Sequence, residues 1–216
     1  MMQDMRRMLG QNKGFTLVEM ALVLIIIGII IGAVVKGKDL VRGAEQKKIY
    51  SKFLNEWRLV YLNFYDRTGR ILGDTQDASV DPATDGQDGQ ADTNAGRDAL
   101  VDSGAATAYR GLRQVGLTPP VSNVPDTPYE YRYVNSEGNT NRLTIQFLYE
   151  DGDPSYNYME IEELPTELAI ALDTMIDGEA DGTDGDFINA DGTNDWDTSG
   201  DTPATNTNTA RWKMQF

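Results

Sequence analysis

The sequence predicts an α+β protein, in which a long N-terminal helix packs on a small antiparallel β-sheet domain with long acidic loops. The first observation behind this prediction is a predominantly apolar run of 21 residues from Phe15 to Val35, with Glu19 as its one charged side chain. At roughly 1.5 Å per residue such a helix is about 32 Å long, close to the roughly 30 Å of a membrane's hydrocarbon core. We therefore expect residues 15–35 to form a transmembrane first half of the helix.

The second observation is that the helical pattern continues beyond the apolar run, over residues 36–67. Apolar side chains recur there at helical spacing and define one face, and no proline occurs between Phe15 and Asp81 to break the helix. The residues of this face are Leu40, Ala44, Tyr50, Leu54, Trp57, Val60, Tyr61 and Phe64. One helix from Phe15 to about Arg67 is expected, with its second half packed on a domain.

The third observation is alternation in the remainder, which we interpret as one head domain over residues 68–216. Residues 129–133 and 143–149 alternate around the turn Asn135–Asn139, which predicts a β-hairpin. Alternation also predicts a last strand with Trp212, Met214 and Phe216 on one face. The stripe of Tyr129, Tyr131 and Tyr133 is expected in the core, and a carbohydrate-binding or electron-transfer surface is the alternative.

Two short helices and two long loops complete the predicted head domain. The helices are Ala105–Val115, ended by Gly116, and one that begins with Thr166 as N-cap and stops at Gly178. Residues 74–104 and 177–209 are rich in Asp and Gly, a composition that predicts loops without a core of their own.

Composition excludes several classes of function. The chain has no Cys and no His, which removes thiolate metal sites, disulfides and the usual general base. No nucleophile motif stands out, so we expect no enzymatic activity. The net charge of −15 argues against nucleic-acid binding, because affinity for phosphates comes from Lys and Arg.

The residues before the apolar run indicate its orientation. Residues 1–14 carry Arg6, Arg7 and Lys13 against Asp4, and positive charge keeps this end in the cytoplasm. No small-residue cleavage site follows the apolar run, and the candidate cleavage residue, Gly14, precedes it. Removal of residues 1–14 would take away three cations and one Asp, which changes the side-chain charge from −15 to about −17.

At these residues the chain resembles the type IV pilin and type II secretion pseudopilin family. A short basic leader ending in Gly is followed by Phe15, Thr16, Leu17, a variable residue, Glu19 and an apolar span. The resemblance implies that a prepilin peptidase cuts between Gly14 and Phe15, and that Phe15 becomes the N-methylated terminus. It also implies that Glu19 is the assembly carboxylate, paired with the terminal amine of a neighbouring subunit. Pairing within one chain, or a simple anchor with Glu19 at the headgroups, are the alternatives.

The resemblance implies a structural subunit of a pilus-like filament, with a pilin-like fold. Expected partners are other pilin subunits in a helical filament, the peptidase and methyltransferase, and an inner-membrane assembly platform. The chain would reside in the bacterial inner membrane with a periplasmic head, and then in a periplasmic or extracellular filament. Lys36 stands near the position where many major pilins have Pro, which favours a minor or specialised pilin. Alternatives are a type II secretion pseudopilin and a filament-displayed adhesin or calcium-responsive binding module.

The acidic segment after residue 176 raises the possibility of bound Ca²⁺, which prefers oxygen ligands on a flexible loop. Asp177, Glu179 and Asp181 have the spacing of the first ligands of an EF-hand loop, with Gly182 at its turn, but Ile188 replaces the closing Glu. Further candidate ligands are Asp184, Asp186, Asp191, Asn194, Asp195 and Asp197, and a separate cluster comprises Asp81, Asp85, Asp88 and Asp92. The alternative is a solvated acidic loop rich in turn-forming residues.

Overall fold

The computed structural model describes residues 14–74, 89–91, 97–101, 111–196 and 206–214. The chain divides into two compact units, residues 1–43 and residues 44–216.

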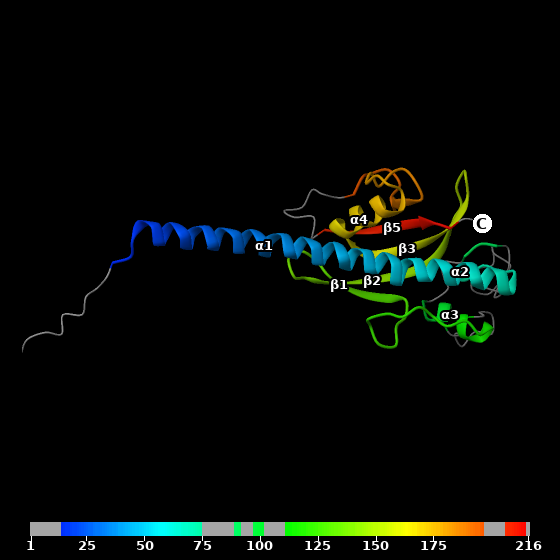
Figure 1. Cartoon of the computed structure of the whole chain (residues 1–216). Coiled ribbons are helices and arrows are strands. Elements are labelled where there is room, and N and C mark those ends of the chain that lie inside the picture. The colour runs from blue at the N-terminus through cyan, green and yellow to red at the C-terminus, as the bar shows by residue number, and fades with distance from the viewer. Residues whose placement is uncertain (1–13, 75–88, 92–96, 102–110, 197–205, 215–216) are drawn as a thin grey trace, which may run out of the picture. The chain divides into compact units, whose positions relative to one another are not determined.

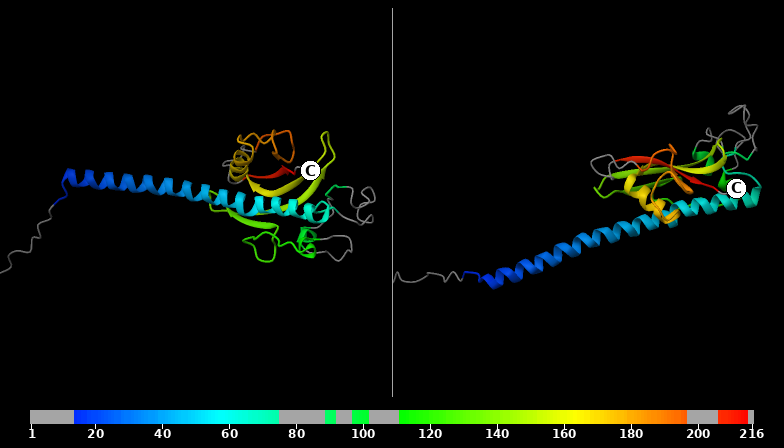
Figure 2. Two further views of the ribbon diagram at one scale, coloured as in Figure 1. Left: turned by 45° about the vertical axis from the view of Figure 1, so that its right-hand side comes forward. Right: turned by 90° about the horizontal axis from the view of Figure 1, so that it is seen from above.

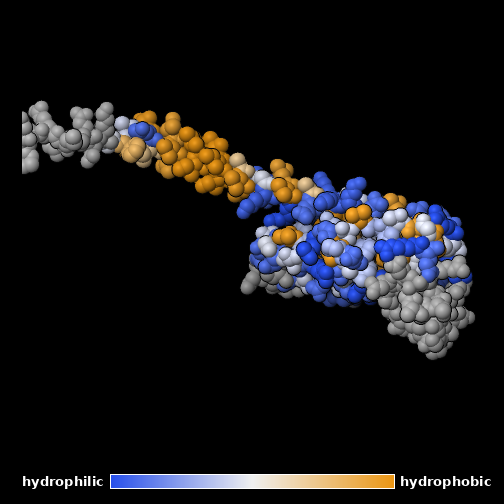
Figure 3. Space-filling view, turned by 90° about the horizontal axis from the view of Figure 1, so that it is seen from below, coloured by the Kyte–Doolittle hydropathy of each residue, from blue (hydrophilic) through white to orange (hydrophobic). Residues whose placement is uncertain are grey.

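The first unit contains the apolar part of helix α1 (Leu17–Ile49), which confirms the predicted long helix but begins two residues later than expected. Its large apolar side chains are exposed: Leu17 is 91%, Leu24 69% and Ile31 59% accessible. Figure 3 shows a continuous apolar surface along this helix. None of the described residues in the apolar window of this helix is buried, so their burial requires lipid or other molecules.

In the second unit the same helical path passes through a π-helical turn, η1 (Tyr50–Leu54), into α2 (Asn55–Thr68). A π-helical turn accommodates one extra residue, and both Phe53 and Leu54 are fully buried although they are adjacent in sequence. Ile49 and Phe53 were missing from the predicted buried face. The prediction was wrong for Leu40 and Ala44, which are exposed, because the part of the helix that contributes to the core begins at Ile49.

The head unit is built on a five-stranded antiparallel sheet in the order β1-β2-β3-β5-β4. The strands are β1 (Glu130–Val134), β2 (Thr140–Glu150), β3 (Tyr156–Pro165), β4 (Phe187–Asn189) and β5 (Thr207–Lys213). The predicted hairpin is confirmed as β1 and β2, with Tyr131 opposite Leu143. The last strand is also confirmed, with Trp212 and Met214 buried, whereas Phe216 lies outside the described residues. Strands β3 and β4 were not predicted.

One face of the sheet packs against η1 and α2 and forms the core with them (Figures 1 and 2). Aromatic rings from the helix and the sheet meet in this core: the ring centroids of Phe53 and Tyr131 lie 5.0 Å apart, and those of the stacked Tyr61 and Phe147 lie 4.8 Å apart. Tyr131 and Tyr133 are 4% and 1% exposed, which places this part of the tyrosine stripe in the core, as expected.

Helix α4 (Thr166–Ile176) packs on β3, β4 and β5 through Leu168, Ala169 and Leu172, which are fully buried. Thr166 is the first helical residue, so its prediction as N-cap was wrong. The N-cap position belongs to Pro165, and the Thr166 hydroxyl instead accepts a hydrogen bond from the side chain of Asn208 at 2.7 Å. Thr166 therefore joins the helix to β5.

The prediction that residues 74–104 form only loop was wrong for its last part. A short helix, α3 (Arg97–Val101), occurs there, and Leu100 and Val101 are buried in the core at 1% and 4% exposure. The predicted helix 105–115 lies mostly outside the described residues. Its described end is a 3-10 turn, η2 (Leu112–Val115), which Gly116 ends as predicted, in a left-handed conformation with φ of 74°.

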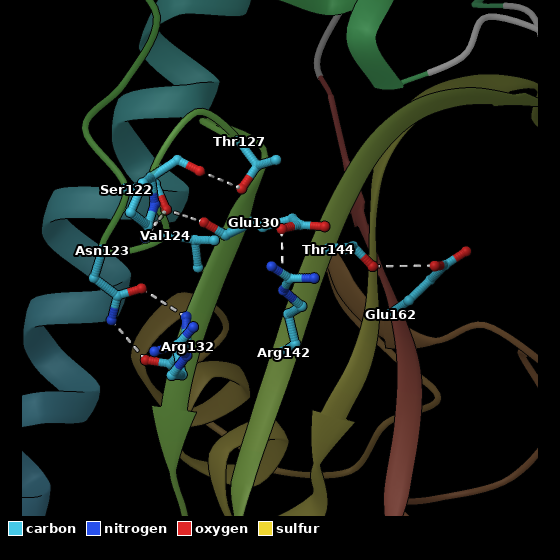
Figure 4. Close-up of polar contacts among 10 residues, drawn as sticks. Ser122, Asn123, Val124, Thr127, Glu130, Arg132, Arg142, Thr144 and Glu162 are labelled. Atoms are coloured by element: carbon cyan, nitrogen blue, oxygen red, sulfur yellow. Dashed lines mark hydrogen bonds and ion pairs between the residues drawn. The ribbon is translucent and has the colours of Figure 1, made fainter.

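Both edges of the sheet are covered by segments that are not strands. At β1, the Asn123 amide pairs with the backbone of Arg132, accepting from its N–H and donating to its carbonyl at 2.7 Å each (Figure 4). At β4, the N–H groups of Phe187 and Asn189 donate to the Asp177 carboxylate and the Gly182 carbonyl, at 2.8 and 2.7 Å. Open strand edges invite pairing with other chains, and these contacts prevent it.

Candidate processing and assembly site

The first turn of α1 is fixed by Thr16. Its hydroxyl oxygen accepts the N–H of Glu19 at 3.2 Å, and its carbonyl accepts the N–H of Met20 at 3.1 Å. Thr16 is therefore the N-cap, and Glu19 is the third helical residue. Thr and Glu at this spacing match the sequence of a capping box, of which the Thr16 half is formed here. A carboxylate in the first turn also interacts favourably with the helix dipole. The sequence analysis did not identify this local role of Thr16 and Glu19, although their spacing carries the signal.

The two residues before this cap lie outside the helix and are accessible. Gly14 and Phe15 have no regular secondary structure, and Phe15 is 74% exposed. Apart from its two chain neighbours, no described residue has a heavy atom within 4 Å of the position that a Cβ would take at Gly14. The peptide bond between them is therefore accessible to a protease, and the helix begins only after it.

The helix that follows is long and apolar enough to cross a membrane. By length and composition it is the one such helix among the described residues, and its apolar window has no buried residue in the chain itself. An exposed linkage outside the helix, a helix cap and an apolar span thus follow one another from Gly14 to Val35.

A family model described as the prokaryotic N-terminal methylation motif matches residues 9–35. The chain carries a prepilin segment of the type IV pilin and pseudopilin type. No curated protein and no solved structure matches the chain. A prepilin segment implies processing by prepilin peptidase and assembly with other pilin-type subunits, and the apolar helix is consistent with membrane anchoring before assembly. The α+β fold, a long N-terminal helix with a small antiparallel sheet, is consistent with a pilin fold.

The predicted metal ligands lie in the segment between α4 and β5, where several of them stabilise turns. The Asp181 carboxylate accepts the N–H groups of Thr183 and Asp184 at 3.1 and 3.0 Å. The Asp191 carboxylate accepts the side-chain amide of Asn194 at 2.7 Å, as well as two backbone N–H groups. These hydrogen bonds, led by that of the Asn194 side chain, lower the pKa of Asp191.

The described residues include no group of three or more carboxylates placed to hold a metal ion. Asp177 and Asp195 accept the N–H groups of Phe187 and Trp196, while Glu179 and Asp184 are exposed and Asp186 is half-buried. The candidates that lie outside the described residues are Asp81, Asp85, Asp88, Asp92 and Asp197. Calcium binding stays a prediction, and the unfolding midpoint with Ca²⁺ and with chelator tests it, since a ligand specific for the native state must stabilise it.

A buried carboxylate that the sequence analysis missed holds this acidic segment to α4. Asp173 is fully buried, and its Oδ2 accepts the indole N–H of Trp196 at 2.7 Å and the N–H of Gly182 at 3.2 Å. Burial raises the pKa of Asp173, and these two hydrogen bonds act in the opposite direction. Helical spacing was the sequence signal for the burial of Asp173, because Asp173 lies four residues after the buried Ala169.

Proposed function

We propose that this protein is a structural subunit of a type IV pilus-like filament, more specifically a minor or specialised pilin. The observation that carries the proposal is the accessible linkage between Gly14 and Phe15 directly before a capped, exposed apolar helix. Cleavage there yields a chain that begins with Phe15, which would then be N-methylated. The apolar helix would anchor the chain in the inner membrane and later lie in the filament core.

Glu19 has a physical reason to act in assembly. An ionised side chain at membrane depth is costly, about 2.5–3.5 kcal/mol on insertion scales, and a buried charge is tolerated when it is paired. Cleavage creates a cationic amine on Phe15, within the same apolar surroundings. We propose that the Glu19 carboxylate of one subunit pairs with the Phe15 amine of its neighbour, which sets the axial position of each subunit.

The head unit supports a structural role in preference to a catalytic one. Its sheet packs one face on the helix, and both edges are covered. We propose that it is displayed in the periplasm before assembly and on the filament surface afterwards. Lys36 in place of the proline common in major pilins, together with the long acidic loops, favours a minor or specialised subunit over a major one.

Mass spectrometry of the exported protein tests the proposal. We expect an N-terminus at Phe15 that is heavier by one methyl group, in filaments sheared from the cells. A chain that begins at Met1 or after Val35 would overturn it. Deletion of the gene distinguishes the two pilin-type roles: loss or shortening of surface filaments supports the pilus subunit, whereas loss of protein secretion with intact pili supports a type II secretion pseudopilin.

A further inference from the structure

A groove of about 540 Å³ lies in the head unit beside the edge strand β1. One wall of the groove is formed by Lys48 at the end of α1, Lys52 of η1 and Val60 of α2. The other wall is formed by the loop that contains Pro119 and Val121. Val121 is 83% exposed, so the groove presents an apolar surface as well as charge. The Asn123 contact to β1 fixes this loop in place (Figure 4).

The groove has an unusual charge for this protein. Residues 59–216 carry 29 acidic and 9 basic side chains, whereas the groove lining has two cations, Lys48 and Lys52, and one carboxylate, Glu56. Both lysines are exposed, and no ion pair joins either of them to another described residue. Since most of the head repels anions, this groove is a distinct place where a carboxylate-bearing segment is attracted.

A segment of that chemistry lies at the opposite edge of the same sheet. Residues 177–186 cover β4, and contacts from Phe187, Asp173 and Lys213 hold them in a defined shape. Glu179 and Asp184 are exposed there, and neither carboxylate accepts a hydrogen bond from another described residue. Four strand spacings of about 4.8 Å place the two edges of the sheet roughly 19 Å apart.

We propose that the groove of one subunit receives the segment 177–186 of the next copy in the filament, with Lys48 and Lys52 facing Glu179 and Asp184. This inference rests on the proposed filament function. The two surfaces differ and lie on opposite edges of one sheet, so the contact is heterologous: each copy offers a free groove at one end and a free acidic segment at the other. A heterologous contact that does not close into a ring generates a helical array, as a filament requires.

Reciprocal charge reversal in the full-length chain tests the contact. We expect the double variant Lys48→Glu with Lys52→Glu to lower the yield of sheared filaments about tenfold, because like charges then face each other. The double variant Glu179→Lys with Asp184→Lys should do the same, and all four changes together should restore assembly. Lys47→Glu is the matched control, since Lys47 is an exposed neighbour on the same helix that does not line the groove.

Zero-length carbodiimide cross-linking of unaltered filaments gives a second measurement. Mass spectrometry should identify a bond between Lys48 or Lys52 and Glu179 or Asp184 of different subunits. Normal assembly of both reversed variants, or loss without rescue by the fourfold variant, would overturn the contact. Loss accompanied by weaker binding to phosphatidylglycerol vesicles would instead assign the lysines to a lipid surface. If the unaltered chain itself forms no filaments, it is the proposed function that fails.

Discussion

The hydrogen bond from Trp196 to Asp173 makes a sharp prediction about what holds the acidic segment to the head. Trp196→Phe removes the indole N–H that donates to Asp173 at 2.7 Å. It retains an aromatic ring to pack on Phe187, whose centroid lies 5.6 Å from that of Trp196. Asp173 would keep the Gly182 N–H as its remaining donor.

The expected magnitude follows from the charge of the acceptor. A hydrogen bond to a charged group contributes about 1.5–3 kcal/mol, and we expect Trp196→Phe to lower the free energy of unfolding by about 2 kcal/mol at neutral pH. In a unit of this size each kcal/mol shifts the melting temperature by about 2–4 °C, so the midpoint should fall by about 4–8 °C.

The effect should depend on pH with a defined sign. Burial raises the pKa of Asp173 above its ordinary value of 3.8, so the ionised carboxylate destabilises the fold. This penalty is fully present above the folded-state pKa and disappears as the pH falls and the native state takes up a proton. Loss of the Trp196 N–H raises the pKa of Asp173 further. The cost of Trp196→Phe should therefore be largest at pH 7 and shrink toward about pH 4.

Circular dichroism melting of the full chain in detergent micelles measures this prediction at both pH values. Asp173→Asn supplies the second background, because a neutral acceptor gives a hydrogen bond worth only about 1 kcal/mol. We expect Trp196→Phe to lower the midpoint less in that background. An equal loss at both pH values and in both backgrounds would show that packing, and not the charged hydrogen bond, accounts for the contribution of Trp196.

Three further predictions follow from other contacts. Gln also suits the third helical position, so peptidase cleavage of Glu19→Gln should proceed. The filament yield should fall at least about tenfold, because the Phe15 amine loses its counter-charge. Normal filaments would refute the charge pairing. Asn123→Ala removes the hydrogen bonds to the backbone N–H and carbonyl of Arg132. The free energy of unfolding should fall by about 2 kcal/mol, and thioflavin-positive aggregation should increase. Unchanged aggregation would show that Asn123 does not protect this edge. Gly185→Ala would place a Cβ against Asp177 Oδ2 at a φ of 94°, and should destabilise the fold by about 2 kcal/mol. An unchanged melting temperature would exclude the clash.

Periodicity predicted the helix and the hairpin but not all of the sheet, for identifiable reasons. In β3 the alternation is short: Tyr158 and Met159 are both buried, and the register shifts between Ile161 and Leu164. Glu163, at a φ of 56°, belongs to this irregularity. Strand β4 has only three residues, too few for a period-two signal.

The covered edges and the groove could not be predicted because they depend on distant segments. Nothing in the spacing around Asn123 indicates that its amide pairs with Arg132, nine residues further along the chain. Leu100 and Val101 lie in a polar stretch and are recruited into the core by contacts elsewhere in the fold. By contrast, the processing segment was predictable, since its signal consists of a few adjacent residues from Gly14 to Glu19.

The helix cap bears on the assembly role that we propose for Glu19. Glu19 lies at the third helical position because Thr16 caps the helix, so its place relative to Phe15 is fixed within each chain. An ionised carboxylate can accept several hydrogen bonds, so the Glu19 side chain could accept one from an amine. In the proposed filament contact, the Glu19 residue would thus be positioned before any neighbour arrives, which reduces the ordering cost of pairing. Thr16→Ala should therefore slow filament assembly although the charge of Glu19 is intact. Comparing the filament growth rates of Thr16→Ala and Glu19→Gln separates the effect of positioning from the effect of charge.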